Sequence, residues 1–162
     1  MIEIILAQEI HTQAIWEIFH NIVKSGDTYV YDPDISKEEA LALWCNKPAT
    51  TYVALYDGQI IGTYIIKPNF PGLGSHIANC SYMVSDKARG LGIGRAMAEH
   101  SINLAKELGF IAMQFNIVVS TNKNAVNLWK SLGFEIIGIT PKGFKHKKLG
   151  YVDSYIMYKS LE

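Results

Sequence analysis

Cysteine is scarce in this chain, with only Cys45 and Cys80 among 162 residues. Two cysteines cannot form a disulfide framework, so their number favours a reducing compartment, and we expect a cytoplasmic protein. An excess of either charge is also missing, because 15 Lys and Arg residues balance 15 Asp and Glu residues. This balance gives no electrostatic reason to expect a nucleic-acid partner or an anionic membrane surface.

Long apolar runs are missing as well. No run reaches the roughly 20 residues that a membrane-spanning helix needs, and no basic segment precedes an apolar signal region at the N-terminus. We therefore expect neither a membrane anchor nor a signal peptide. The histidines follow no metal-ligand spacing, so we expect no metal.

The chain does contain enough apolar sequence for one folded domain spanning residues 1–162, with 49% hydrophobic and 19% charged residues. The hydrophobic periodicity predicts a mixed α/β order, with strands before and after each of the later helices. The predicted helices cover residues 10–23, 36–44, 93–108 and 122–132. The predicted strands cover residues 1–7, 50–56, 59–67, 76–84, 110–119, 134–140 and 151–158.

Local signals set several of these boundaries. Asp57-Gly58 predicts a hairpin turn, and Ser36 with Glu39 has the capping-box spacing of a helix start. Gly109 and Gly133 are placed to end helices. In the first helix we expect the buried face to hold Ile10, Ala14, Ile18 and Ile22. The basic segment KGFKHKK (142–148) is expected to be a solvated loop, although it could also reach a coenzyme's ribose phosphate.

The most informative stretch is RGLGIG (89–94), which lies between a predicted strand and a predicted helix. Backbone N–H groups at such a helix start, without side chains over them, can bind a phosphate. A tight turn is the simpler alternative. The dinucleotide-binding fingerprint does not fit, because these glycines alternate strictly and the next strand has no acidic residue. The phosphate loop of nucleotide hydrolases does not fit either, because G-K-[S/T] is absent.

The stretch RGLGIG matches [Q/R]-x-x-G-x-[G/A], and NKNAVNLWKSLGF (122–134) resembles N-x-x-A-x-x-L-Y-x-x-x-G-F. These are the two signatures of GCN5-related N-acetyltransferases, the GNAT superfamily. The resemblance implies one mixed, mostly antiparallel sheet of about seven strands, splayed between strands 4 and 5 and flanked by about four helices. It also implies acetyl-CoA as cosubstrate and allows a homodimer. The coenzyme contacts that it implies are Met83, Val84, Arg89, Gly90, Leu91, Gly92, Ile93, Gly94, Arg95, Asn122 and Trp129.

Residues 60–141 resemble more closely the azetidine-2-carboxylate N-acetyltransferases of yeast, which acetylate proline analogues. That resemblance places substrate contacts at Asn79, Tyr82 and Asn116, with Asn79 and Asn116 as the catalytic candidates. Strand alternation puts Gln114 and Asn116 on one face, where an amide pair could grip a carboxylate. The structural alternative is a pair of satisfied amides that bridge the splayed strands.

The superfamily resemblance implies direct attack of an amine on the thioester, without an acyl-enzyme. We accordingly expect Cys80 to be a core residue and backbone N–H groups near Val84 to polarise the acetyl carbonyl. Trp129 stands where many members have a tyrosine that protonates the leaving thiolate, so water or Tyr158 would have to replace it. The expected activity is acetylation of a small amino-acid-like amine. The alternatives are a protein or peptide acetyltransferase and a coenzyme A-binding sensor.

Overall fold

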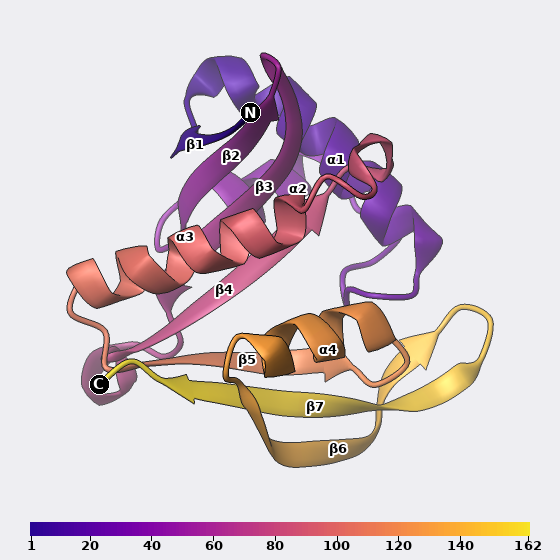
Figure 1. Ribbon diagram of the computed structural model, residues 1–162. Coiled ribbons are helices and arrows are strands. Elements are labelled where there is room, and N and C mark those ends of the chain that lie inside the picture. Colours follow the sequence, from indigo (N-terminus) through magenta and orange to yellow (C-terminus); the bar gives the residue numbers. More distant parts are fainter.

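The protein is built around one mixed β-sheet, and the computed structural model describes all residues from 1 to 162 (Figure 1). The strand order is β1-β2-β3-β4-β5-β7-β6, and every neighbouring pair is antiparallel except β4 and β5. The strands are β1 (Ile2–Leu6), β2 (Thr50–Tyr56), β3 (Gln59–Pro68), β4 (Ile77–Val84), β5 (Ala112–Val119), β6 (Glu135–His146) and β7 (Gly150–Ser160). The helices are α1 (Thr12–Ser25), α2 (Lys37–Cys45), α3 (Ile93–Glu107) and α4 (Lys123–Ser131). The predicted α/β fold class is confirmed.

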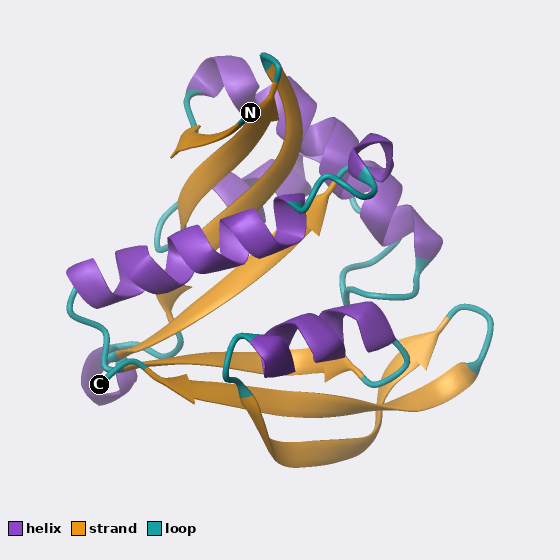
Figure 2. Cartoon of the chain, in the orientation of Figure 1, coloured by secondary structure: helices purple, strands orange, loops and turns teal.

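The four helices cover the sheet in two pairs, as Figure 2 shows. Helices α3 and α4 lie over one face, and α1 and α2 lie over the other. Because successive side chains of a strand point to opposite faces, one strand can contribute to two apolar cores. On β4, Cys80 packs into the core beneath α3 and α4, whereas Met83 packs into the core beneath α1 and α2.

Most of the predicted boundary signals are confirmed. The Ser36 hydroxyl accepts a hydrogen bond from the Glu39 N–H at 3.1 Å and caps α2. Asp57 and Gly58 both have positive φ at the tip of the β2–β3 hairpin, which matches the twist of its strands. Gly109 and Gly133 follow the ends of α3 and α4, also with positive φ.

One prediction about local structure is wrong in part and another is wrong. In the predicted buried face of α1, Ile18 is buried and Ala14 and Ile22 are half-buried, and the other buried residues are Ile15, Phe19 and Val23. Ile10 is 82% exposed, because it belongs to the short 3-10 helix Glu9–His11 that precedes α1. Residues 142–146 do not form a loop either. They extend β6, because Phe144 and His146 pair with Val152 and Gly150 on β7.

The extended β6–β7 hairpin has a structural consequence at its tip. The Lys147 N–H donates to the Gly26 carbonyl at 3.0 Å, so the tip is held against the C-terminal end of α1. Residues 27–29, which follow Gly26, line the cavity described below. No helix in the structure combines the length and the apolar character that crossing a bilayer requires.

Candidate functional site

The parallel strands β4 and β5 pair only at their beginnings and then separate. Ile77 pairs with Ala112 and Ala78 with Met113, and the ladder has no further registered pair. The Ser85 N–H bonds to the Ile61 carbonyl on the β3 side, so alternation turns the polar backbone groups of Cys80, Tyr82 and Val84 toward the gap. The middle of the sheet therefore contains a strand edge that can bind a ligand.

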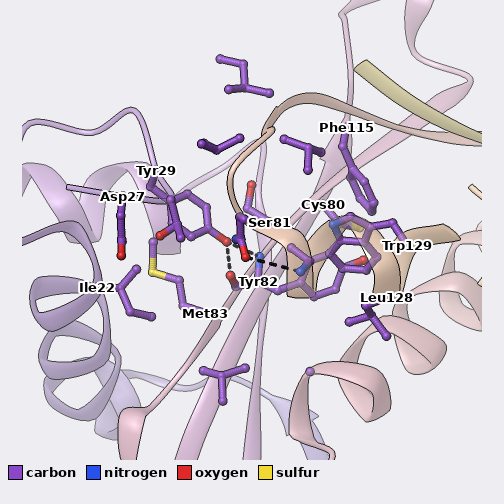
Figure 3. Close-up of a pocket in the computed structure, with 18 of the residues that line it drawn as sticks. Ile22, Asp27, Tyr29, Cys80, Ser81, Tyr82, Met83, Phe115, Leu128 and Trp129 are labelled. Atoms are coloured by element: carbon purple, nitrogen blue, oxygen red, sulfur yellow. Dashed lines mark hydrogen bonds between the residues drawn. The ribbon is translucent and has the colours of Figure 1, made fainter. Parts of the chain in front are cut away.

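A cavity of about 390 Å³ occupies this gap (Figure 3). Figure 3 shows Ile22, Asp27 and Tyr29 at one side of β4 and Phe115, Leu128 and Trp129 at the other. The cavity thus passes through the plane of the sheet, from the α1 side to the α4 side. A second cavity of about 150 Å³ adjoins it and shares part of its wall, namely Thr28, Tyr29, Cys80, Ser81, Phe115 and Ile117.

The N-terminal turn of α3, which follows the glycine turn, provides one end of the large cavity. Gly90 has φ 77° and Gly92, the N-cap residue of α3, has φ 73°, a left-handed conformation that favours glycine. Gly94 lies in the first turn of the helix and lines the cavity. The first turn holds no acidic residue, so the free N–H groups and the positive end of the helix dipole face no competing carboxylate. These features suit a phosphate.

The predicted contacts around this turn do not all present side chains. Arg89 and Leu91 are exposed beside the turn, whereas Ile93 is buried in the core and could offer only its backbone. The Arg95 guanidinium donates to the Ser131 hydroxyl at 2.7 Å and pairs with Glu99 at 3.6 Å, so it links α3 to α4.

Helix α4 closes the same side of the large cavity. Asn122 is its N-cap residue, and the Asn122 Oδ1 accepts from the Ala125 N–H at 3.4 Å. Trp129 is 8% exposed, and its ring lies 5.0 Å from Tyr82 and 4.5 Å from Phe115, measured between centroids. Asn122 and Trp129 both line the cavity, as do Met83 and Val84 of β4.

Asn79 lies at the point where the two strands separate. Its Nδ2 donates to the Gln114 carbonyl at 2.9 Å, one residue beyond the last paired residue of β5. Asn79 therefore bridges the separating strands β4 and β5, as expected if the asparagines have a structural role. The Asn79 Oδ1 makes no hydrogen bond and is not sealed from solvent, so it is free to accept one from a ligand.

Asn116 belongs to a hydrogen-bonded chain of amides on the same face of the sheet. Its Nδ2 donates to the Asn69 Oδ1 at 2.8 Å, and its Oδ1 accepts from the Gln114 Nε2 at 3.1 Å. Asn79 and Asn116 both line the small cavity, so the fold brings these two predicted residues together.

Tyr82 lies on the opposite face from the two asparagines. Its hydroxyl donates to the Ser101 Oγ at 2.6 Å, because Ser101 donates its own proton to the Ala98 carbonyl. Burial raises the pKa of Tyr82 well above its usual value. The Tyr82 ring therefore forms part of the wall of the large cavity. Its hydroxyl points into the core beneath α3 and away from Asn79 and Asn116.

Cys80 lines both cavities but is a poor nucleophile. Burial raises the pKa of its thiol to about 12, against the weaker lowering effect of the nearby Tyr82 and Ser101 hydroxyls. The thiolate is therefore scarce near neutral pH. Tyr158 lies outside both cavities, on β7 opposite Gln114. It is not placed to replace a hydroxyl at position 129.

Two further residues of the site were not singled out by sequence reasoning. The Tyr29 hydroxyl donates to the Tyr82 carbonyl and accepts from the Tyr82 N–H at 3.1 Å, so it occupies the free edge of β4. Burial raises the pKa of Tyr29, which keeps this hydroxyl neutral. Lys67 lines the small cavity beside Asn79. The only signal for Tyr29 was the pair of tyrosines at 29 and 31, and a strand lysine such as Lys67 gives no signal.

Comparison with known proteins identifies the family. Residues 14–134 match the model described as the acetyltransferase (GNAT) family. N-acetyltransferase aca1 of Schizosaccharomyces pombe is 41% identical over 99 residues, which are 60% of this chain and 47% of that protein. The chain thus spans about half the length of that relative.

Solved structures show the same fold along the whole chain. A GCN5-related N-acetyltransferase from Kribbella flavida superposes with a TM-score of 0.94 at 42% identity, covering 98% of this chain and 97% of the other. The structure of yncA from Salmonella typhimurium, solved with its cofactor acetyl-CoA, superposes with a TM-score of 0.87 at 22% identity, covering 100% and 95% of the two chains.

Proposed function

Because this chain belongs to the acetyltransferase (GNAT) family, we propose that it is an N-acetyltransferase and that it acetylates the amine of a small amino-acid-like acceptor. The proposed donor is acetyl-CoA, and the amine attacks the thioester directly. The observation that carries this proposal is the cavity through the sheet, which extends from Gly94 in the first turn of α3 to the adjoining small cavity lined by Asn79 and Asn116.

The α3 side of the large cavity is suited to acetyl-CoA. We assign the pyrophosphate to the turn Arg89–Gly94, where backbone N–H groups and a helix N-terminus without acidic residues favour an anion. Arg95 contributes through its backbone, since its guanidinium is engaged with Ser131 and Glu99. The pantetheine arm is assigned to the gap beside Met83, Val84, Asn122 and Trp129.

Acetyl-CoA supplies an acetyl group that is activated as a thioester. The Val84 N–H, at the free edge of β4, is the proposed donor to the acetyl carbonyl oxygen. The raised pKa of Cys80 makes its thiol a poor nucleophile near neutral pH, which supports direct attack over an acyl-enzyme. Asn79 and Asn116 position the acceptor and take no proton, because an amide cannot act as a base near neutral pH. Water carries the amine proton away.

The coenzyme A thiolate that leaves must also be protonated. Trp129 borders the cavity, and its indole N–H can donate a hydrogen bond but cannot give up a proton. We propose that the thiolate is protonated by water. Tyr158 does not border the cavity.

The acceptor is proposed from the size and polarity of the small cavity. Its volume of about 150 Å³ suits an amino-acid-sized molecule, and its amides suit a polar one. This agrees with the resemblance to proline-analogue acetyltransferases.

Release of free coenzyme A thiol from acetyl-CoA tests the proposal. The acceptors are a panel of amino acids, cyclic imino acids and short peptides, each measured against an enzyme-free control. We expect the fastest release with an amino or imino acid. Fastest release with peptides would replace the proposal by a peptide acetyltransferase, and no release with any acceptor would overturn it.

A further inference from the structure

A row of polar side chains crosses β3, β4 and β5 on the face that α1 and α2 cover. Lys67 on β3 is the direct partner of Asn79 on β4, and paired residues of neighbouring strands point to the same face. Gln114 and Asn116 lie on this face of β5, since Met113 and Phe115 pack into the opposite core. We call these four residues the polar row. Elsewhere on the same face, Val53, Ile65 and Met83 are apolar.

Lys67 is the only charged member of the row, and its charge has no partner. The structure contains two ion pairs, Met1–Asp57 and Arg95–Glu99, and Lys67 takes part in neither. No acidic residue lines the small cavity. Asp27, the one acidic residue of the large cavity, accepts a hydrogen bond from the Ser25 hydroxyl at 2.7 Å. Lys67 is a half-buried residue, and an ammonium group without a counter-ion at a cavity wall is a favourable site for an anionic ligand.

The hydrogen bonds within the row distinguish the lysine from the amides. Each amide nitrogen already donates once: Asn79 to the Gln114 carbonyl, Gln114 to Asn116, and Asn116 to Asn69. The Lys67 ammonium donates to no group in the protein, so all three of its N–H bonds are free. The Asn79 Oδ1, by contrast, is a free acceptor and suits an amine N–H.

These positions give the small cavity a polarity. Lys67 supplies positive charge on β3, whereas the free Asn79 oxygen belongs to a side chain of β4 that reaches toward β5 across the gap between these strands. An acceptor with an amine and a carboxylate matches both groups when its amine faces the gap.

We propose that Lys67 binds the carboxylate of the acceptor, so that the enzyme selects amino or imino acids with a free carboxylate over their uncharged derivatives. This inference rests on the proposed function and specifies which acceptors that function accepts. Lys67 is a specificity-determining residue in this scheme and takes no part in proton transfer.

The test compares L-proline with L-prolinamide and glycine with glycinamide, as pairs that differ in the carboxylate. Thiol release is measured for wild type, Lys67→Met and Lys67→Arg. We expect the acids to be preferred by wild type. Lys67→Met should lower kcat/KM for the acids about ten- to a hundredfold, mainly through KM, and leave the amides unchanged, because one charged hydrogen bond is lost. Lys67→Arg should retain part of the preference. Lys106→Met, at an exposed lysine of α3, is the matched control.

A binding measurement separates failure of this inference from failure of the proposed function. With coenzyme A saturating, L-proline or glycine should raise the Tm of wild type and not that of Lys67→Met. Coenzyme A alone should raise the Tm of both proteins equally. Equal losses for acids and amides in Lys67→Met, or no shift by either acid in wild type, would overturn the role of Lys67. The assignment of acetyl-CoA would then still stand on the coenzyme A shift.

Discussion

The Asn79 side chain donates from Nδ2 to the Gln114 carbonyl at 2.9 Å, at the residue where β4 and β5 stop pairing. A side chain thus takes up a backbone acceptor that a continuing ladder would use. The same residue has its Oδ1 free on the small cavity. Asn79 is therefore structural through its nitrogen and available to the acceptor through its oxygen, whereas the exposed Asn116 does not bridge the two strands.

This difference predicts separate effects for the two alanine variants. Asn116→Ala should lower kcat/KM for the acceptor about ten- to a hundredfold with little change in Tm or coenzyme A affinity. Asn79→Ala should lower kcat/KM and also the free energy of unfolding, by about 1 kcal/mol, because the Gln114 carbonyl loses its partner. Steady-state kinetics and thermal melts of both variants provide the measurement. A large loss of stability in Asn116→Ala with unchanged kinetics would make Asn116 scaffolding.

Gly94→Leu should abolish the rise in Tm that coenzyme A causes in wild type. A Cβ at this helical position would lie 3.8 Å from Leu128 and 3.9 Å from Val84, which is ordinary contact, so the variant should fold. The rest of the leucine side chain would enter the large cavity, which Gly94 lines. Asn103→Leu, on the exposed side of the same helix, is the control. An undiminished shift in Gly94→Leu would remove the pyrophosphate assignment.

Trp129→Tyr should not lower turnover by orders of magnitude, since it restores the residue common at this position of the second signature. Its Tm should fall modestly, because the smaller ring loses contact with Tyr82 and Phe115. Trp129→Phe, which has neither the indole N–H nor a hydroxyl, is the comparison. Single-turnover and steady-state rates of thiol release measure the effect. A collapse of activity in a well-folded Trp129→Tyr would assign a specific role to the indole.

Cys80→Ala should keep turnover within about fivefold of wild type, since a thiol with a pKa raised to about 12 is scarcely ionised near neutral pH. Some stability should be lost with the buried side chain. Mass spectrometry after mixing with acetyl-CoA should detect no acetylated Cys80. Stoichiometric acetylation of this thiol on the timescale of turnover would contradict direct attack.

Stability should depend on pH through His100, whose Nδ1 lies 2.7 Å from the Tyr64 hydroxyl. Burial lowers the pKa of His100 below its usual 6.5, against the raising effect of Glu107. The unfolded chain therefore binds this proton more readily than the folded one. The free energy of unfolding should be level above about pH 7 and fall as pH drops through about 6.5 toward the folded pKa.

His100→Gln should flatten this part of the profile, because glutamine can still bond to Tyr64 but does not titrate. Chemical denaturation of both proteins at a series of pH values between about 5 and 8 measures the difference. Parallel profiles for the two proteins would show that His100 does not contribute.

Local sequence patterns predicted most of the secondary-structure elements and the turn to which we assign the pyrophosphate. The hairpin at Asp57-Gly58, the cap at Ser36 and the glycines after α3 and α4 act over a few residues, so local patterns were sufficient to place them. The turn at residues 89–94 could be recognised for the same reason, since its chemistry lies in consecutive backbone groups.

The lining of the small cavity could not be predicted from local patterns. The small cavity gathers Tyr29 from the loop after α1, Lys67 from β3, Asn79 from β4 and Asn116 from β5. The buried face of α1 and the extension of β6 through residues 142–146 likewise depend on partners far along the chain. Each of these features arises from pairing between distant segments, and a lysine or tyrosine in a strand or loop carries no local signal of the cavity that it will face.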